Sequence, residues 1–501
     1  RRATAPVRSG GKEYPAGSYV ISLAQPAKRL IRTLLDPKVE MDEAFVKEME
    51  RRRKKKLPDE VYDVTAWSLP LMYNVEAVAS SEVTKGNLEP VRPALIPPGS
   101  IRGGKAEVAY LAPWGTAASA RLLAAALRGG LRVLSGDKPF TLDGKKFPSG
   151  TLIFKLKDNA PDLAQTLEKL ASSSGAEIIG TNTSWVDEGV NFGSRYVSVM
   201  PKPAVALAWD TPTSSGSAGA TRFVLERQYG YPVTPIRTQQ LALTDLRRFQ
   251  VLILPEGSAA GYSQALGPSG LERLKSWLAA GGTLIGIGGA VSFLADPKVG
   301  LLATSQEDAP RPGEPPKKPE PKDGRIPGKV LATEEDYTRA IQAETELPDR
   351  TLGVLLRAKL DPDHWITAGL GETVNVLAQG RAIFTPLKLD KGVNAAVYLG
   401  SEQLVASGYL WEESRKQFAH KPFLMVQREG RGLVIAFTAD PNVRAYLDGL
   451  NVLFFNAVFR GAAHARPSGI GGFIEDDSWG TSGEHNAAPH RQTEEKPDEH
   501  G

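Results

Sequence analysis

The chain contains no cysteine, and this absence excludes several kinds of chemistry. Disulfide bonds, thiolate nucleophiles and zinc sites built from cysteine ligands are all ruled out. A strong excess of one charge is lacking too, because 61 Lys and Arg side chains stand against 57 Asp and Glu side chains and leave a net charge of +4. A charge this small indicates neither a nucleic-acid partner nor a membrane-surface binder.

Long apolar runs are also missing. The stretch at 121–134 is interrupted by Arg and Gly, well short of the ~20 residues that a membrane span requires. The first residues, "RRATAPVRSGG", have neither an initiator Met nor the apolar centre of a signal peptide, which predicts a chain that was processed or cut from a longer one. What is present is 501 residues, 41% of them hydrophobic, a composition typical of a globular protein with roughly three domains.

A sequence repeat is the most informative feature. "GKEYPAGSYVI" at 11–21 returns as "GKKFPSGTLIF" at 144–154, an offset of 133 residues (144 − 11). The ungapped match runs to Leu35 and includes nine identities: Gly11, Lys12, Pro15, Gly17, Leu23, Ala27, Leu30, Thr33 and Leu34. Each copy predicts a Pro/Gly turn, a strand (18–24 and 151–157) and an amphipathic helix (27–35 and 160–170).

The second copy is preceded by a further passage that predicts a strand at 106–112, a helix at 117–130 closed by Gly129, and a strand at 131–136. The first copy has no such passage, since the chain begins where the equivalent of its last strand ends. This pattern predicts that residue 1 falls inside a module and that the chain is truncated. The alternative is a degenerate repeat that lost its first half.

The third region alternates apolar strands with helices, as in a parallel, doubly wound sheet. Strands are predicted at 204–209, 231–237, 249–257, 283–289, 394–400, 422–429 and 432–440, and helices at 219–229, 270–282, 290–296, 333–346 and 451–463. The predicted fold class is therefore α/β, with two related α/β modules followed by a flavodoxin-like, doubly wound domain. The predicted domains are 1–100, 101–200, 201–465 with a flexible, Pro-rich insertion at 305–328, and a disordered tail at 466–501.

Several stretches together resemble the C-terminal half of bacterial zinc carboxypeptidase-like proteins of the carboxypeptidase A-type metallopeptidase family. These are "YPAGSYVISLAQPAKRLIRTLL", "YDVTAWSLPLMYNVEA", "VLILPEG", "GGTLIGIGGA" and "GRGLVIAFTADPNVRAYLDGLNVLFFNAVF". The resemblance implies a final domain similar to class I glutamine amidotransferases and a secreted or periplasmic location. It also implies that the partner is an upstream peptidase domain of the same parent chain, which would hold the zinc.

No catalytic or metal-binding residue is predicted within the chain itself, and no cofactor. A peptidase of this type needs a His-x-x-Glu pair, yet none of the six histidines (His364, His420, His464, His485, His490 and His500) has Glu three residues later. In the turn "GIGGA", Gly288 stands where the resemblance to class I amidotransferases places the nucleophilic Cys. Glutaminase chemistry is therefore excluded.

A crevice is still expected at the carboxyl ends of the parallel strands. Asp210, Glu256, Gly286, Gly288 and Gly289 are the candidates to line it, either around a peptide or small ligand or as ordinary solvated loop ends and packing glycines. The glycines do not match the dinucleotide-binding pattern G-x-G-x-x-G, because its sixth position, with Gly286 as the first, is Val291. Two functions stay open: a non-catalytic accessory region of a metallopeptidase, and a stand-alone binding protein that uses this crevice.

Two further patterns have mainly structural interpretations. The basic run from Arg51 to Lys56 follows acidic residues on a predicted helix, which favours a solvated helix end over a nucleic-acid site. Trp67 and Trp185 recur in "TAW" and "TSW", and core packing is predicted for both rather than a platform for sugars.

Overall fold

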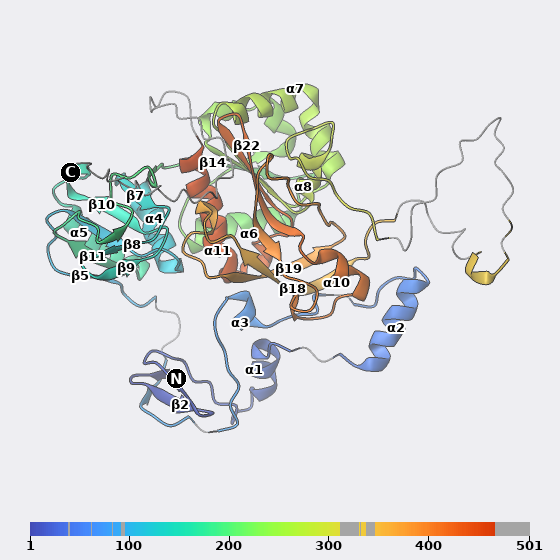
Figure 1. Cartoon of the computed structure of the whole chain (residues 1–501), viewed down its shortest axis with the longest axis horizontal. Helices are drawn as coiled ribbons and strands as arrows, with labels where there is room; N and C mark the ends of the chain where they lie inside the picture. The colour runs from blue at the N-terminus through green and yellow to red at the C-terminus, as the bar shows by residue number, and fades with distance from the viewer. Residues whose placement is uncertain are drawn as a thin grey trace, which may run out of the picture. The chain divides into compact units, whose positions relative to one another are not determined.

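The computed structural model describes residues 1–38, 41–61, 63–82, 84–91, 96–310, 330, 332–336 and 346–465 (Figure 1). The predicted tail and most of the predicted insertion and of the helix at 333–346 lie outside these residues. The start of the insertion is described, and it is bonded: the N–H of Glu307 donates to the carbonyl of Ile383 at 2.8 Å, and its carboxylate pairs with Lys421. Residues 305–309 thus belong to the folded protein, which corrects the predicted start of the flexible insertion at 305.

One ten-stranded sheet organises the third region. Five of its strands are parallel neighbours in the order β15, β14, β16, β17, β23. Their bounds are β14 Val205–Trp209, β15 Thr234–Arg237, β16 Val251–Leu254, β17 Thr283–Ile287 and β23 Gly432–Phe437. Counted along the chain, this spatial order is the 2-1-3-4-5 order of flavodoxin-like folds. The predicted α/β class and the doubly wound sheet are therefore confirmed.

The rest of the sheet is antiparallel. β22 pairs with β23 and is followed by β20, β18 and β19, while β21 pairs with β18. The bounds are β18 Thr351–Leu360, β19 Thr373–Gly380, β20 Val393–Tyr398, β21 Val405–Ser407 and β22 Pro422–Glu429, with helix α10 at Glu412–Phe418. Predicted strands at 394–400 and 422–429 are present, whereas β18 and β19 were not predicted.

Helices cover both faces of the parallel strands. The helical segments are α6 Ser215–Phe223, η2 Val224–Gln228, η3 Thr238–Leu243, η4 Leu246–Arg248, α7 Ala259–Ala279, α8 Gly289–Ala295, η5 Trp365–Thr367, η6 Val443–Ala445, α11 Asp448–Phe455, η7 Asn456–Arg460 and α12 Gly461–His464. Leu252 and Leu284 pack in one cluster with α7 and α8, and Ile253 and Ile285 pack in another with η2, α11 and η7. Successive strand residues therefore enter opposite cores, as a sheet buried on both faces requires.

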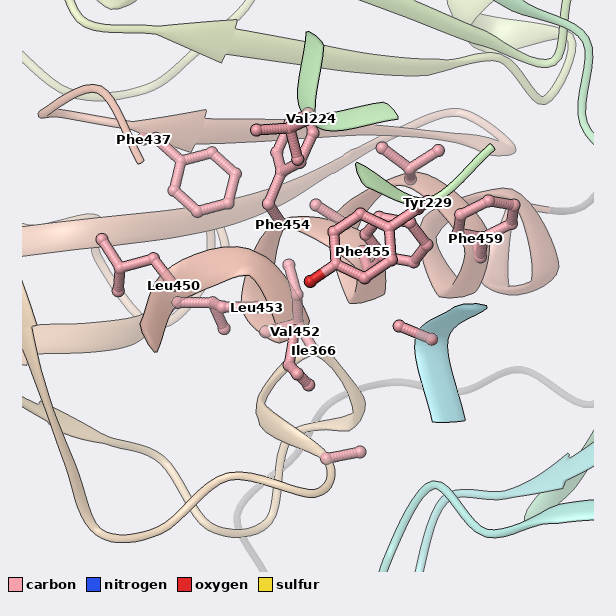
Figure 2. Packing of buried hydrophobic residues seen from close by; sticks show 14 of the residues in the cluster. Val224, Tyr229, Ile366, Phe437, Leu450, Val452, Leu453, Phe454, Phe455 and Phe459 are labelled. Carbon is pink, nitrogen blue, oxygen red and sulfur yellow. The ribbon is translucent and has the colours of Figure 1, made fainter. Parts of the chain in front are cut away.

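Aromatic side chains fill the core beneath α11 and η7. Figure 2 shows Phe454, Phe455 and Phe459 beside Tyr229 of the segment that follows η2. The rings of Tyr229 and Phe455 lie 4.3 Å apart between centroids. The apolar helix predicted at 451–463 is confirmed as this continuous helical run, and its side chains are buried against the sheet.

The second module has its own six-stranded sheet, in the order β13, β7, β10, β6, β11, β5. Its elements are β5 Ser100–Arg102, β6 Ala109–Ala112, α4 Ala117–Arg128, β7 Val133–Gly136, β10 Leu152–Lys155, η1 Leu156–Asp158, α5 Leu163–Ser174, β11 Glu177–Thr181 and β13 Val197–Met200, with β8 Phe140–Leu142, β9 Lys145–Phe147 and β12 Glu188–Gly189 in a three-stranded sheet. The predicted strand–helix–strand passage is confirmed as β6, α4 and β7. β10 lies between the two strands and is antiparallel to both.

The first module repeats part of this pattern. It contains β1 Arg2–Ala3, β2 Val7–Ser9, β3 Lys12–Tyr14, α1 Lys28–Leu35, α2 Glu43–Lys54, α3 Leu69–Met72 and β4 Leu88–Glu89. β2 pairs with β3 as Val7↔Tyr14, and at the same offset β8 pairs with β9 as Phe140↔Phe147. The predicted strand at 18–24 is wrong, because Tyr19 makes an isolated bridge to Arg2 and no regular strand follows.

The basic run at the end of α2 is partly buried, which corrects its interpretation as a solvated helix end. The Arg53 side chain is 13% exposed and pairs with Asp349 at 2.6 Å and with Glu50 at 2.8 Å. Its guanidinium lies 5.0 Å from the ring of Trp411. Burial opposes the charged form, but the hydrogen bonds that Arg53 donates to Asp349 and Glu50 outweigh it and raise the pKa of Arg53. Arg53 therefore anchors the first module to the third region.

A buried polar junction joins the second module to the helices that follow β23. Arg460, 2% exposed, donates to Asp137 at 2.7 Å, and His464 Nε2 lies 3.3 Å from the same carboxylate oxygen. Burial alone would raise the pKa of Asp137, but the hydrogen bonds and charges of His464 and Arg460 outweigh it and hold that pKa below its ordinary value. Nearby, Trp114 Nε1 donates to Asn456 Oδ1 at 3.0 Å.

His364 is buried at this junction, and it makes stability depend on pH. Burial, reinforced by the positive charge of His464 and opposed by Asp137, lowers the pKa of His364 to about 4. The unfolded chain binds the proton near pH 6.5, so stability falls as pH drops from about 6.5 to about 4 and loses no more from this group below that. At ~1.4 kcal/mol per pKa unit, the loss between pH 7 and pH 4.5 is about 2.5 kcal/mol.

Urea unfolding at pH 7 and pH 4.5 checks this, with His364→Asn as the matched variant. Asn can accept the N–H of Ile366 as His364 Nδ1 does, but it cannot titrate. We expect the loss of stability on acidification to be about 2.5 kcal/mol smaller in the variant. Equal losses in the two proteins would contradict the prediction.

Candidate functional site

A sharp turn joins β17 to α8 at the carboxyl end of the parallel sheet. Gly288 has φ 55 and ψ −118, a conformation that favours glycine. Its N–H donates to the carbonyl of Phe437 at 2.8 Å, which fixes the turn against the end of β23. The chain therefore forms a strand-to-helix elbow at the position where the sequence predicted one.

The carboxylate of Glu256 fills the space above this elbow. Its Oε2 accepts the N–H of Gly289 at 2.7 Å. A Cβ atom built on Gly288 would lie 1.7 Å from the same oxygen. A side chain at 288 and the present position of Glu256 are thus mutually exclusive.

A second acid and a serine complete the cluster. Ser217 Oγ of α6 accepts the N–H of Glu256 at 3.1 Å and is hydrogen-bonded to the carboxylate of Asp440, which also accepts the N–H of Asn442 at 2.8 Å. Burial raises the pKa of Glu256, with a smaller contribution from the Asp440 charge, against the opposing bond from Gly289. Burial likewise raises the pKa of Asp440. Two partly buried acids therefore lie close together, with both pKa values raised.

The predicted crevice residues are not all brought together. Glu256, Gly288 and Gly289 are in contact, but the Asp210 side chain is 58% exposed, with Arg237 at 4.0 Å. Gly286 is buried within β17, where an added Cβ would lie 2.5 Å from Leu294 Cδ1 of α8. Gly286 thus allows close packing of strand and helix. Whether the crevice binds a ligand stays a prediction.

Sequence reasoning missed Ser217, Asp440 and Asn442. Asp440 could have been found by the rule that identified Asp210 and Glu256, because it follows the apolar strand that ends at Phe437. Ser217 gives no such signal, since it reaches the cluster from the first turn of α6. Asn442 is 1% exposed, donates to Thr221 Oγ1 at 3.2 Å and holds the loop after Asp440 against α6.

The histidines do not assemble a metal site in the described part of the chain. No group of three His, Asp or Glu side chains there is placed to hold a metal ion. His364 and His464 belong to the polar junction, and His420 follows α10. His485, His490 and His500 lie outside the described residues.

The two repeated tryptophans have different environments. Trp67 is half-buried, with the ring of Tyr446 at 6.1 Å and the guanidinium of Arg444 at 5.5 Å. Trp185 is 80% exposed, so the prediction of core packing is wrong for it. It borders a cavity of about 660 Å³ whose lining also includes Phe192, Lys155 and Asn191. A local hydrogen bond holds the loop at Trp185, because the backbone N–H of Trp185 donates to Thr183 Oγ1 at 2.9 Å.

Comparison with known proteins gives similarity in fold alone. No protein-family profile and no curated protein sequence matches the chain. A ThuA-like protein of Parabacteroides merdae is similar with a TM-score of 0.35 and 11% identity, over 52% of this chain and 88% of its own. A GMP synthase protein of Thermoplasma acidophilum has a TM-score of 0.30 and 12% identity, over 52% of this chain and 96% of its own.

A glutamine amidotransferase of Thermotoga maritima is similar with a TM-score of 0.28 and 11% identity, over 52% of this chain and 89% of its own. The structural neighbours thus include ThuA-like and glutamine amidotransferase-like folds. At such low TM-scores these likenesses carry no argument about what this chain does.

Within the described residues, no helix combines the length and the apolar composition that a membrane span needs.

The conflict between Glu256 and a side chain at 288 can be measured. Gly288→Ala should lower the free energy of unfolding by about 3 kcal/mol, since it forces an unfavourable backbone conformation and displaces Glu256 from the Gly289 N–H. In Gly288→Ala/Glu256→Ala the loss should be about 1 to 2 kcal/mol smaller than the sum of the single losses, because the clash is gone. Urea unfolding of the four proteins gives this coupling energy.

Gly219→Ala is the matched control. Gly219 lies in α6, and an added Cβ there has no neighbouring atom within 4 Å. This substitution should change stability by less than about 1 kcal/mol, in the stabilising direction. Strictly additive losses for Gly288→Ala and Glu256→Ala would mean that Glu256 does not occupy the space above the elbow.

Proposed function

We propose that the chain is the non-catalytic C-terminal accessory region of a zinc carboxypeptidase-like metallopeptidase, and that it supports or positions a peptidase domain. The peptidase domain and its zinc would lie outside residues 1–501. The observation that carries the proposal is the occupied elbow. The resemblance to class I amidotransferases places a nucleophile at 288, where this chain has glycine and the Glu256 carboxylate fills the space.

The contacts between modules support a positioning role. Arg53 of the first module pairs with Asp349, and Asp137 of the second module pairs with buried Arg460. Truncating one partner of a buried ion pair such as Arg460–Asp137 costs about 3 to 5 kcal/mol, so this contact resists separation of the two modules. A chain with modules fixed in this way is suited to hold an attached domain in one orientation. The resemblance further favours a secreted or periplasmic setting.

Two assays on the purified chain test the proposal. The chain should release no C-terminal residue from a peptide with added Zn²⁺, and no ammonia from glutamine. Co-expressed with the peptidase domain encoded by the reading frame upstream, it should co-purify with that domain. Chelator-sensitive peptide cleavage by the chain alone, or a reading frame with no His-x-x-Glu domain upstream, would contradict the proposal.

Ligand binding is the second candidate function, and the cavity beside Trp185 favours it. Its volume of about 660 Å³ is that of a small-molecule site, and it combines the apolar side chains of Trp185 and Phe192 with polar side chains such as Lys155. The crevice beside Glu256 is the other place where a peptide or small ligand could bind.

A thermal-shift screen of free amino acids, dipeptides, mono- and disaccharides separates the two places. A ligand of the cavity should lose its stabilising effect in Trp185→Ala and keep it in Glu256→Ala, whereas a ligand of the crevice should show the reverse. Stabilisation by none of these compounds, or stabilisation that survives both substitutions, would contradict this function.

A further inference from the structure

Three pairs of equivalent apolar residues in the two repeat copies differ strongly in exposure. In the second copy, Leu152 and Phe154 of β10 and Leu163 of α5 are 1%, 0% and 2% exposed. Their equivalents at the offset of 133 are Tyr19, Ile21 and Leu30, which are 65%, 53% and 60% exposed. We call Tyr19, Ile21 and Leu30 the open face of the first module. The three buried equivalents belong to one core cluster, so the first module exposes large apolar side chains at positions where the repeat has a core, which indicates a site of interaction.

In the second copy a strand and a helix cover these positions. β6 pairs with β10 in antiparallel register, Leu152↔Ala112 and Phe154↔Tyr110. Helix α4 packs against α5, and its Leu122 and Leu123 belong to the same buried cluster as Leu163. The covering unit is therefore the passage β6–α4, a short strand followed by an Ala/Leu-faced helix.

The backbone of the first module already has the conformation that this unit requires. Gly17 N–H donates to Ala3 O at 2.7 Å and Ala3 N–H donates to Ser18 O at 2.8 Å, and the equivalent bonds join Gly136 to Gly150 and Thr151 at 2.6 and 3.2 Å. The turn before the open face thus has the same hydrogen-bonding pattern in both copies.

One edge of the open face is paired and the other is available. Val20 exchanges both backbone bonds with Arg1, at 2.8 and 2.9 Å, as β10 pairs with β7 through Ile153↔Leu134. In an antiparallel ladder alternate residues bond to opposite sides, so the N–H and C=O groups of Tyr19 and Ile21 are directed to the other edge. Among the described residues, Tyr19 bridges to Arg2, and no strand lies on that other edge.

Helix α1 is uncovered in the same way and has a charged margin. All eight of its residues are described and none is buried. Lys28, Arg29 and Arg32, the last paired with Asp36, make it basic, whereas the equivalent residues are Pro161 and Asp162, just before α5, and Gln165 within it. A helix that packs on α1 would therefore be stabilised by acidic residues along its flank.

We propose that the open face binds a strand–helix unit from another polypeptide segment. The strand pairs antiparallel to residues 19–21, and the helix covers Leu30 with an Ala/Leu face flanked by acidic residues. The unit resembles β6–α4, which in the second module is itself buried and so is not free to exchange. The existence of this binding surface is inferred from the repeat alone and does not depend on the proposed accessory role. The accessory role would affect only which polypeptide supplies the strand–helix unit.

The strand–helix unit of the second module can be used to test whether the open face binds such a unit. Because Leu134 is equivalent to Arg1, a second copy of residues 106–133 fused directly before Arg1 of the full chain places β6 and α4 in repeat register. We expect amide hydrogen exchange at residues 19–35 to slow by about tenfold or more relative to the unfused chain, with exchange in β16 and β17 unchanged.

The control is the same fusion with Leu122→Asp and Leu123→Asp in the added copy, which should leave residues 19–35 exchanging as in the unfused chain. Two results would overturn the proposal. One is unchanged exchange at 19–35 in the intact fusion. The other is an unfused chain that is dimeric by light scattering with 19–35 already protected, since a second copy would then cover the face. No peptidase enters this experiment, so the accessory role can fail independently.

Discussion

An apolar face of a strand or helix is stable in water when another element covers it, and the regions of this protein differ in how they satisfy that constraint. In the third region helices bury both sides of the parallel strands, so that Leu252 and Ile253, neighbours in sequence, enter different cores. In the second module β6 and α4 cover β10 and α5. In the first module the equivalents of the same buried residues are exposed. We propose that a strand–helix unit from another polypeptide segment covers them.

Buried charge sets a second constraint. Arg460 is almost fully buried, and a buried guanidinium is tolerated when its charge is paired. Its partner Asp137 comes from the second module, so the helical run after β23 and the end of β7 are fixed to one another. At the elbow the same principle has another outcome: the Glu256 carboxylate gains the N–H of Gly289 and fills the space that a nucleophile would need. The sharp strand-to-helix turn is kept, and a side chain at 288 is excluded from it.

The hydrophobic pattern of the sequence predicted most of the parallel sheet. Short, continuous apolar runs such as 251–254 and 283–287 are typical of strands that are buried on both faces of a sheet. The strand expected at 18–24 failed for the opposite reason. Its apolar residues match those of β10, but among the described residues it has a hydrogen-bonded neighbour on one edge alone, at residues 1–3, whereas β10 is paired on both edges by β6 and β7. β18 and β19 went unpredicted, although their apolar residues are buried in the same sheet.

The sequence by itself determined the α/β class, the repeat, the absence of thiol chemistry and the elbow at Gly288, because these depend on residue type, spacing and local backbone preference. Only the tertiary structure decided that Asp440 and Ser217 join Glu256, that Arg53 is anchored rather than solvated, and that Trp185 is exposed while Trp67 is half-buried. Each of these outcomes depends on which distant segment lies against the residue. Which segment lies there is set by the packing of whole elements, and it cannot be predicted from a local sequence pattern.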